Sequence, residues 1–226
     1  MKVEPSSVAG IELAGPDAAT FIPAVEALYG RVVDDVLRPA LPYSVIARNE
    51  GSRTIALLGI RFDMTGPNGK KYSVIHYADA LRHPEKAELV PGAVRFVCAE
   101  PLYTDLVLRQ AREIDHRSRM NLDNLRKALR IRASVDCAAF DNGQFEGPDS
   151  NGGFDRLERE RRTESEFVQE VLRKEASHME AFLQEAVEIS ECKGLARRWL
   201  SALQQAGPEE ARARTANHRL RIKLHR

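Results

Sequence analysis

Hydrophobic residues follow a helical period near the start of the chain. Within 17–37, apolar residues recur at steps of three and four, which places them on one face of a helix. They are Phe21, Val25, Leu28, Val32, Val36 and Leu37. Proline at 23 is tolerated only in a first helical turn, and Pro39 prevents the helix from continuing, so we predict one helix that ends before Pro39.

A period of two replaces the helical period from residue 43. Segments rich in aliphatic and β-branched residues alternate with turn residues, and they comprise 43–49, 54–64, 72–77, 87–90, 93–99, 129–140 and 144–147. Strands that recur about every ten residues are typical of a β-sandwich or a small barrel. The turn residues at 49–52 predict that the first two strands form an antiparallel pair, and the pairs Asn68-Gly69 and Asn142-Gly143 predict two further hairpins.

The strand at 129–140 shows the alternation most clearly. Its apolar set is Leu129, Ile131, Ala133, Val135 and Cys137, and its polar set is Arg130, Arg132, Ser134 and Asp136. We therefore predict a half-buried strand with Cys137 on its core face. Whether Cys98 and Cys137 are neighbours is left open.

Helical periodicity returns after residue 153. No glycine or proline occurs within 154–190, so we predict one long amphipathic helix there, followed by a short helix that ends at Gly207 and Pro208. The apolar stripe of the long helix is a candidate partner-binding surface that consists of Phe167, Val171, Leu172, Met179, Phe182 and Leu183. This stripe packs either on the chain's own strands or against another chain, and the two alternatives are compatible.

These patterns divide the chain into four parts. We expect an N-terminal lead and helix at 1–40, a β-sandwich at 41–147 with a helical or polar insert at 104–127, a helical segment at 148–206 and a basic tail at 207–226. The predicted fold class is mainly β with helical additions (α+β), namely an immunoglobulin-like antiparallel β-sandwich plus a long C-terminal amphipathic helix.

Several turns in the middle of the chain carry a resemblance. The segment 43–62, the Gly-Pro-Asn-Gly-Lys turn at 66–70, the Pro91-Gly92 step and the sequence VDCAAFDNGQFEGP at 135–148 together resemble a group of uncharacterised bacterial proteins. Those proteins have an immunoglobulin-like β-sandwich followed by a helical segment. The resemblance covers about half of the 226 residues and implies a fold, but it implies no activity, cofactor or functional residue.

Composition restricts the compartment and the partners. The chain has 34 Lys and Arg against 33 Asp and Glu, so its net charge of +1 gives no overall reason to bind polyanions or membranes. Three cysteines, at 98, 137 and 192, are too few for a disulfide framework and favour a reducing compartment. No apolar run approaches the roughly 20 residues of a membrane-spanning helix. We expect a cytoplasmic protein without a transmembrane segment.

Charge is uneven at the C-terminal end. Residues 197–226 contain eight Lys or Arg and two Asp or Glu. The candidate anion-binding residues there are Arg212, Arg214, Arg219, Arg221, Lys223 and Arg226. Such a tail suits an anionic polymer or a membrane surface, or it stays solvated.

Catalytic motifs are missing from the sequence. It contains no G-x-S-x-G elbow, no P-loop and no G-x-G-x-x-G. His76, Asp79 and His83 have spacings that suit a metal on one helical turn, but His76 falls on a predicted strand, so this trio is a weak metal candidate. We therefore expect no catalytic residue and no cofactor, and we do not expect an enzyme. Three hypotheses about function remain, given in order of decreasing support. The first is a noncatalytic interaction or scaffold protein whose sandwich and long helix bind a protein partner or a second copy. The second is an anionic-polymer or membrane-surface binder, and the third is a metal-assisted hydrolase.

Overall fold

The chain forms two compact units. The computed structural model describes residues 1–30, 37–80, 88–100, 116–189 and 192–216. The first unit, here called the sheet unit, ends at Ser150, and the second, the helical unit, begins at Asn151. This boundary lies three residues beyond the predicted end of the sandwich at 147.

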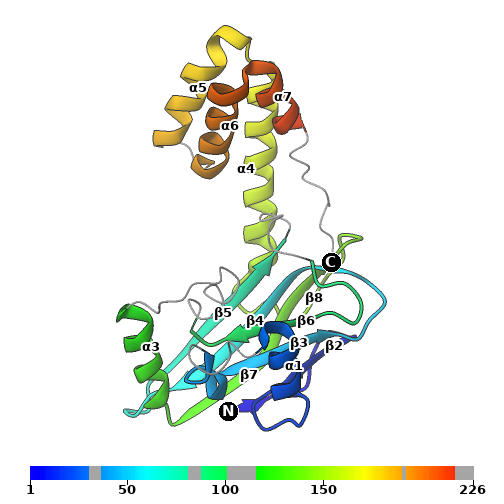
Figure 1. Cartoon of the computed structure of the whole chain (residues 1–226), viewed down its shortest axis with the longest axis vertical. Coiled ribbons are helices and arrows are strands. Elements are labelled where there is room, and N and C mark those ends of the chain that lie inside the picture. The colour runs from blue at the N-terminus through cyan, green and yellow to red at the C-terminus, as the bar shows by residue number, and fades with distance from the viewer. Residues whose placement is uncertain (31–36, 81–87, 101–115, 190–191, 217–226) are drawn as a thin grey trace. The chain divides into compact units, whose positions relative to one another are not determined.

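The sheet unit contains a five-stranded sheet, here called sheet A (Figure 1). Its strands are β1 (Lys2–Val3), β4 (Ile55–Thr65), β5 (Lys71–Asp79), β7 (Arg130–Phe140) and β8 (Phe145–Glu146). Their order is β1-β7-β4-β5, and β8 also pairs with β7. All pairs are antiparallel except β1 with β7. The predicted hairpins are confirmed, because the turn at Asn68-Gly69 joins β4 to β5 and the turn at Asn142-Gly143 joins β7 to β8.

A three-stranded sheet, sheet B, completes the sheet unit. It consists of β2 (Ile11–Ala14), β3 (Ser44–Asn49) and β6 (Val94–Cys98), with β3 in the middle and both pairs antiparallel. Helix α1 (Phe21–Tyr29) packs against β3, and the ring of Tyr29 meets that of Phe96 edge-on. A short 3-10 turn, η3 (Leu41–Tyr43), leads into β3. The predicted helix at 17–37 is therefore confirmed for 21–29, while Val32 and Val36 lie outside the described residues.

One hydrophobic core joins both sheets. It includes Phe62 and Ile60 of sheet A, Ile46 and Phe96 of sheet B, and Phe21 of α1, each at most 2% exposed. Helix α3 (His116–Arg126) adds Leu122 and Leu125 to this core. The predicted insert is therefore helical at 116–126, and its first part, with Leu106, Leu108 and Ile114, lies outside the described residues. The fold is a mixed α+β arrangement with two mostly antiparallel sheets, which does not by itself establish the immunoglobulin-like class.

The predicted pairing of the first two long strands is wrong. β3 belongs to sheet B and β4 to sheet A, so the chain crosses between the sheets at 50–54. The side chain of Asn49, only 1% exposed, holds this crossing together. Its Nδ2 donates to the carbonyls of Arg53 and Leu89, both at 2.8 Å, and its Oδ1 accepts the Gly51 amide at 3.0 Å. Turn residues that suit a hairpin also suit a crossing, since both reverse the chain.

The prediction that Cys137 lies on the core face is wrong, because β7 contains a β-bulge. β7 pairs Val135 with Ile60 and Cys137 with Gly59, so Asp136 is one extra residue on β7. Before the bulge, Ile131, Ala133 and Val135 face the core, and after it Ala138 and Phe140 do. Cys137 therefore lies on the opposite face of sheet A, beside Gly59, whereas Cys98 lies in the shared core. The two cysteines are consequently not neighbours.

Within its described residues, the helical unit contains four helices instead of one long and one short helix (Figure 1). They are α4 (Gly153–Arg173), α5 (Ala176–Ile189), α6 (Lys193–Ala206) and α7 (Pro208–Ala216). The prediction of an unbroken helix through 154–190 is wrong, because α4 ends at Arg173 and Lys174 adopts an extended backbone conformation. The predicted end of the short helix at Gly207 is confirmed, and Pro208 begins a further helix, α7, which was not predicted.

Candidate functional site

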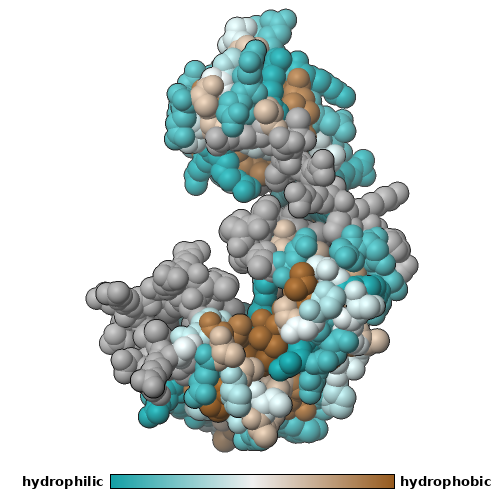
Figure 2. All heavy atoms as spheres, turned by 45° about the vertical axis from the view of Figure 1, so that its right-hand side comes forward, coloured by the Kyte–Doolittle hydropathy of each residue, from teal (hydrophilic) through white to brown (hydrophobic). Residues whose placement is uncertain are grey.

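The candidate partner-binding stripe lies largely inside the helical unit. Phe167, Val171, Met179 and Leu183 are at most 7% exposed and belong to the core of this unit. Phe182 is half-buried and stacks on Phe167, and Leu172 is 38% exposed. The visible surface of the helical unit is mostly hydrophilic (Figure 2). Most of the stripe is therefore used to pack α4, α5 and α6 together.

The candidate anion-binding tail is described only in part. Arg212 of α7 donates from Nη2 to the backbone carbonyl of Lys174 at 2.6 Å. A cation at this position satisfies a carbonyl at the C-terminal end of α4 and interacts favourably with the helix dipole. Arg214 also belongs to α7. Arg219, Arg221, Lys223 and Arg226 lie outside the described residues.

The two described residues of the weak metal candidate do not point toward a common site. His76 and Asp79 both lie on β5, three residues apart, and therefore on opposite faces of sheet A. The ring of His76 meets that of Phe62 edge-on at the core, and its Nε2 lies 3.2 Å from the carbonyl of Ala99. His83 lies outside the described residues. Within the described ranges, no three His, Cys, Asp or Glu side chains are grouped in a way that could hold a metal ion.

Cys98 is a thiol in the core of the sheet unit. Burial raises its pKa to about 11, although hydrogen bonding with Ser44 and the hydrogen bond from the Glu100 amide act in the opposite direction. A thiol with this pKa is protonated near neutral pH and is a poor nucleophile. Its position in the shared core explains why a cysteine is accommodated there as a small hydrophobic residue.

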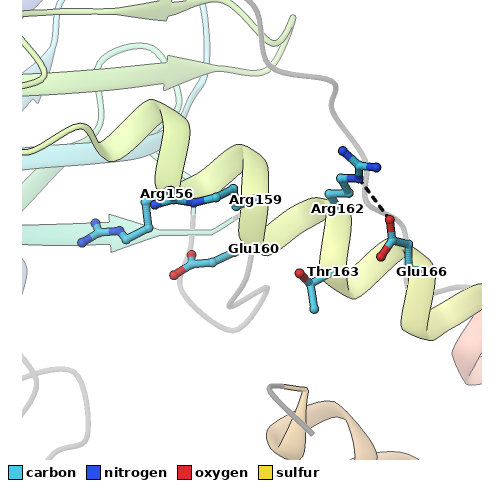
Figure 3. Close-up of a pocket in the computed structure, with 6 residues that line it drawn as sticks. All are labelled: Arg156, Arg159, Glu160, Arg162, Thr163 and Glu166. Carbon is cyan, nitrogen blue, oxygen red and sulfur yellow. Dashed lines mark hydrogen bonds and ion pairs between the residues drawn. The ribbon is translucent and has the colours of Figure 1, made fainter.

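A charged hollow of about 540 Å³ lies beside α4 (Figure 3). Its lining consists of Arg156, Arg159, Glu160, Arg162, Thr163 and Glu166, all from this one helix. Arg162 and Glu166 pair with each other at 3.0 Å, and their side chains are 83% and 67% exposed. Such i,i+4 pairs support an exposed helix. We therefore interpret this hollow as the solvent-exposed side of α4.

A more promising arrangement lies on the outer face of sheet A. On β4, Ile60, Phe62 and Met64 face the core, so Arg61 and Asp63 between them project to the other side. The register of β5, β7 and β1 brings further polar residues onto the same side. We call this set the basic face, and it consists of Lys2, Arg61, Asp63, Thr65, Lys71, Ser73, Arg130, Arg132 and Ser134.

Strand pairing arranges the basic face in rows. One row is Lys71, Thr65 and Arg130, and the next is Ser73, Asp63, Arg132 and Lys2. Neighbouring strands lie about 4.8 Å apart and alternate residues of one strand about 7 Å apart, so the five cations lie within one continuous area on this side of the sheet. Toward the other end of the strands this side of the sheet is apolar, with Leu57, Cys137 and Ala139 fully buried.

Asp63 is the one carboxylate among these residues, and its neighbours hold it ionised. Its Oδ1 accepts hydrogen bonds from Arg61 Nε at 2.8 Å and from the Ser73 hydroxyl at 2.5 Å, and its Oδ2 lies 3.9 Å from Arg132. Burial alone would raise the pKa of Asp63, but the hydrogen bonds from Ser73 and Arg61 and the charges of Arg61 and Arg132 lower it below its ordinary value. Asp63 thus orients Arg61 and leaves most of the positive charge uncompensated.

Four of the five cations of the basic face are solvent-exposed, and Arg61 is half-buried. Lys71 and Arg130 are exposed, and Lys2 pairs with Glu4 at 3.0 Å at the margin. Arg132 has a side chain that is 44% exposed. The site can therefore hold negative charge, and it presents guanidinium groups that bind carboxylates through two N–H donors.

Sequence reasoning found part of this site. The alternation within 129–140 placed Arg130 and Arg132 on one polar face, which the structure confirms for these residues. Arg61, Asp63 and Lys71 were not singled out, because their proximity to Arg130 and Arg132 depends on which strands pair with β4. The signal available in the sequence was that two polar residues, at 61 and 63, alternate with apolar residues of the same strand.

Comparisons with protein families, with curated proteins and with solved structures found no match to this chain. None of the helices in the described ranges has both the length and the apolar character required to cross a membrane.

Proposed function

We propose that the protein is a noncatalytic binding protein whose basic face holds an acidic protein partner. The observation that carries this proposal is the arrangement in rows of Arg61, Lys71, Arg130 and Arg132 around the carboxylate of Asp63 on an exposed sheet face, with Lys2 paired to Glu4 at the margin. Complementary charge steers a partner to such a face and selects against basic partners. No aromatic ring belongs to the basic face, so stacking of nucleic-acid bases has no support there.

Other expectations remain part of the proposal. An immunoglobulin-like class for the sheet unit is supported by the core that both sheets share. A cytoplasmic location is supported by three cysteines that are all buried thiols. A second interaction surface on the helical unit is supported less, because only Leu172 and Phe182 of its apolar stripe reach the surface.

Binding of fluorescein-labelled poly-L-glutamate, followed by fluorescence anisotropy, tests the proposal. The double variant Lys71→Glu/Arg130→Glu reverses two exposed charges in one row and should bind at least about tenfold more weakly at low salt. The control Arg197→Glu/Arg198→Glu makes the same change of net charge on exposed residues of α6 and should bind within about twofold of the wild type. Equal losses in both variants, or no binding of poly-L-glutamate by the wild type, would overturn the proposal.

Binding through the C-terminal tail is the alternative function. A chain that ends after Ala216 lacks Arg219, Arg221, Lys223 and Arg226 but keeps Arg212 on α7. Unchanged binding of poly-L-glutamate and of anionic lipid vesicles by this shorter chain would exclude the tail. Loss of binding there, with no effect of Lys71→Glu/Arg130→Glu, would favour the tail over the basic face.

A further inference from the structure

β5 is the edge strand of sheet A. It follows β4 in the order β1-β7-β4-β5, and none of the described strands pairs with its other side. At the start of the strand Lys71, Tyr72 and Ser73 are exposed. An edge strand of nine residues presents backbone donors and acceptors that another strand can use.

The hydrogen-bond pattern shows which backbone groups of β5 point outward. The amide of Gly66 donates to the carbonyl of Lys70, and the amide of Ala80 donates to the carbonyl of Ala56. Both pairs continue the register of β4 with β5, and hydrogen-bonded pairs alternate with non-bonded pairs in an antiparallel ladder. Even-numbered residues of β5 therefore bond to β4, while Lys71, Ser73 and Ile75 direct their N–H and C=O groups away from it.

These outward-pointing residues also contribute to the basic face. The side chains of Lys71 and Ser73 project on the same side of sheet A as Arg61, Asp63 and Arg130. A strand added to β5 would therefore place every second side chain in the row beside Lys71 and Ser73. Acidic side chains at those alternate positions would extend the rows with the complementary charge.

Charge decides between two occupants of this edge. A second copy, paired antiparallel through β5 about a twofold axis, would set one basic face beside another in a continuous sheet, and like charges opposite each other are destabilising. An acidic segment replaces this repulsion with attraction. The lysines at 70 and 71 also fit the usual role of edge lysines, which discourage pairing of a sheet with itself.

We infer that residues 71–75 of β5 bind an extended acidic peptide segment as an additional strand of sheet A. This inference rests on the proposed function and specifies its partner. Backbone hydrogen bonds to Lys71, Ser73 and Ile75 would supply affinity, and alternate carboxylates over the basic face would supply specificity.

Two octapeptides of equal charge test the inference. The probe is acetyl-(Thr-Glu)₄-amide, which can form a strand, and the control is acetyl-(Pro-N-methylGlu)₄-amide. In this control every residue lacks its backbone N–H, so the donors toward β5 are missing in either strand direction. We expect the first peptide to bind at least about tenfold more tightly by isothermal titration calorimetry. Equal affinities of the two peptides would overturn the inference and leave the proposed function intact. The same conclusion would follow if poly-L-glutamate bound to the protein and the first peptide did not.

A variant of the edge supplies an independent measurement. The N–H of Ser73 points away from β4, so Ser73→Pro removes an outward donor without removing a ladder hydrogen bond. Ser73→Ala is the matched control, because it also loses the hydroxyl that donates to Asp63. We expect Ser73→Pro to abolish the preference for (Thr-Glu)₄ over (Pro-N-methylGlu)₄, and Ser73→Ala to keep it. A preference retained in Ser73→Pro, or a dimer that forms through β5 and excludes the peptide, would overturn the inference.

Discussion

The ring of Phe167 stacks on the indole of Trp199, with 5.5 Å between the ring centroids and 9° between the planes. Phe182 stacks on Phe167 as well, at 5.7 Å, so three rings join α4, α5 and α6. Lys174 Nζ lies 4.6 Å from the centre of the Phe182 ring. The helical unit is therefore organised around aromatic contacts between residues far apart in its sequence.

Truncation of Phe167 should destabilise the helical unit. Phe167→Ala removes both ring contacts and should lower the free energy of unfolding by about 3–5 kcal/mol. Because Trp199 is the chain's only tryptophan, its fluorescence during urea unfolding reports on this unit. Leu172→Ala, at a position 38% exposed, is the control and should cost less than about 1.5 kcal/mol. Equal unfolding midpoints for the two variants would contradict the stacked arrangement.

Gly59 and Cys137 should show a coupled effect. A Cβ at Gly59 would lie 2.8 Å from the Cys137 sulfur and 3.2 Å from the Tyr77 ring, so Gly59→Ala should cost about 1–3 kcal/mol. Cys137→Ala removes the sulfur, and Gly59→Ala should cost less in that background. A double-mutant cycle measured by urea unfolding checks this interaction. Strict additivity would argue against Cys137 facing Gly59.

Loss of the Asn49 side chain should destabilise the crossing between the sheets. Asn49→Ala leaves the carbonyls of Arg53 and Leu89 and the amide of Gly51 without this partner, which should cost about 2–4 kcal/mol. Asn68→Ala is the matched control, because Asn68 Oδ1 accepts only the Lys70 amide, in an exposed turn. That change should cost less than about 1 kcal/mol. Circular dichroism during chemical unfolding measures both variants, and a similar small cost for each would show that Asn49 does not hold the crossing.

The stabilising effect of Asp63 should depend on pH. Hydrogen bonds from Ser73 and Arg61 outweigh burial and lower the pKa of Asp63 in the folded protein. Its contribution is therefore fully present above the unfolded-state pKa of about 3.9 and is lost as the pH falls through the folded-state pKa. Because the Asp63 side chain is half-buried at the surface, solvent screens these interactions and the contribution should not exceed about 1 kcal/mol.

Asp63→Asn provides the comparison. Wild type and variant should differ most in their unfolding midpoints at pH 6, and the difference should shrink as the pH falls below about 4. Unfolding curves at several pH values and constant ionic strength measure this difference. A gap that widens toward low pH would mean that the pKa of Asp63 is raised instead of lowered.

Local patterns sufficed for most individual strands. The alternation at 129–140 predicted β7 because apolar residues on one face must avoid water, and Asn68-Gly69 predicted a hairpin because it accepts positive φ angles. The same patterns failed at Cys137, where an extra residue at Asp136 reverses the alternation. A bulge is selected by contacts with the neighbouring strand, and these are not encoded within the strand itself.

The sequence by itself determined the positions of most strands, the α+β class and the helical character of the C-terminal part, since these depend on periodicity over short windows. Tertiary structure decided that β3 and β4 lie in different sheets, that the chain turns at Lys174, and that Arg61 and Lys71 lie beside Arg130 and Arg132. Those features depend on contacts between residues distant along the chain, whose free energies arise only when the sheets and helices pack together.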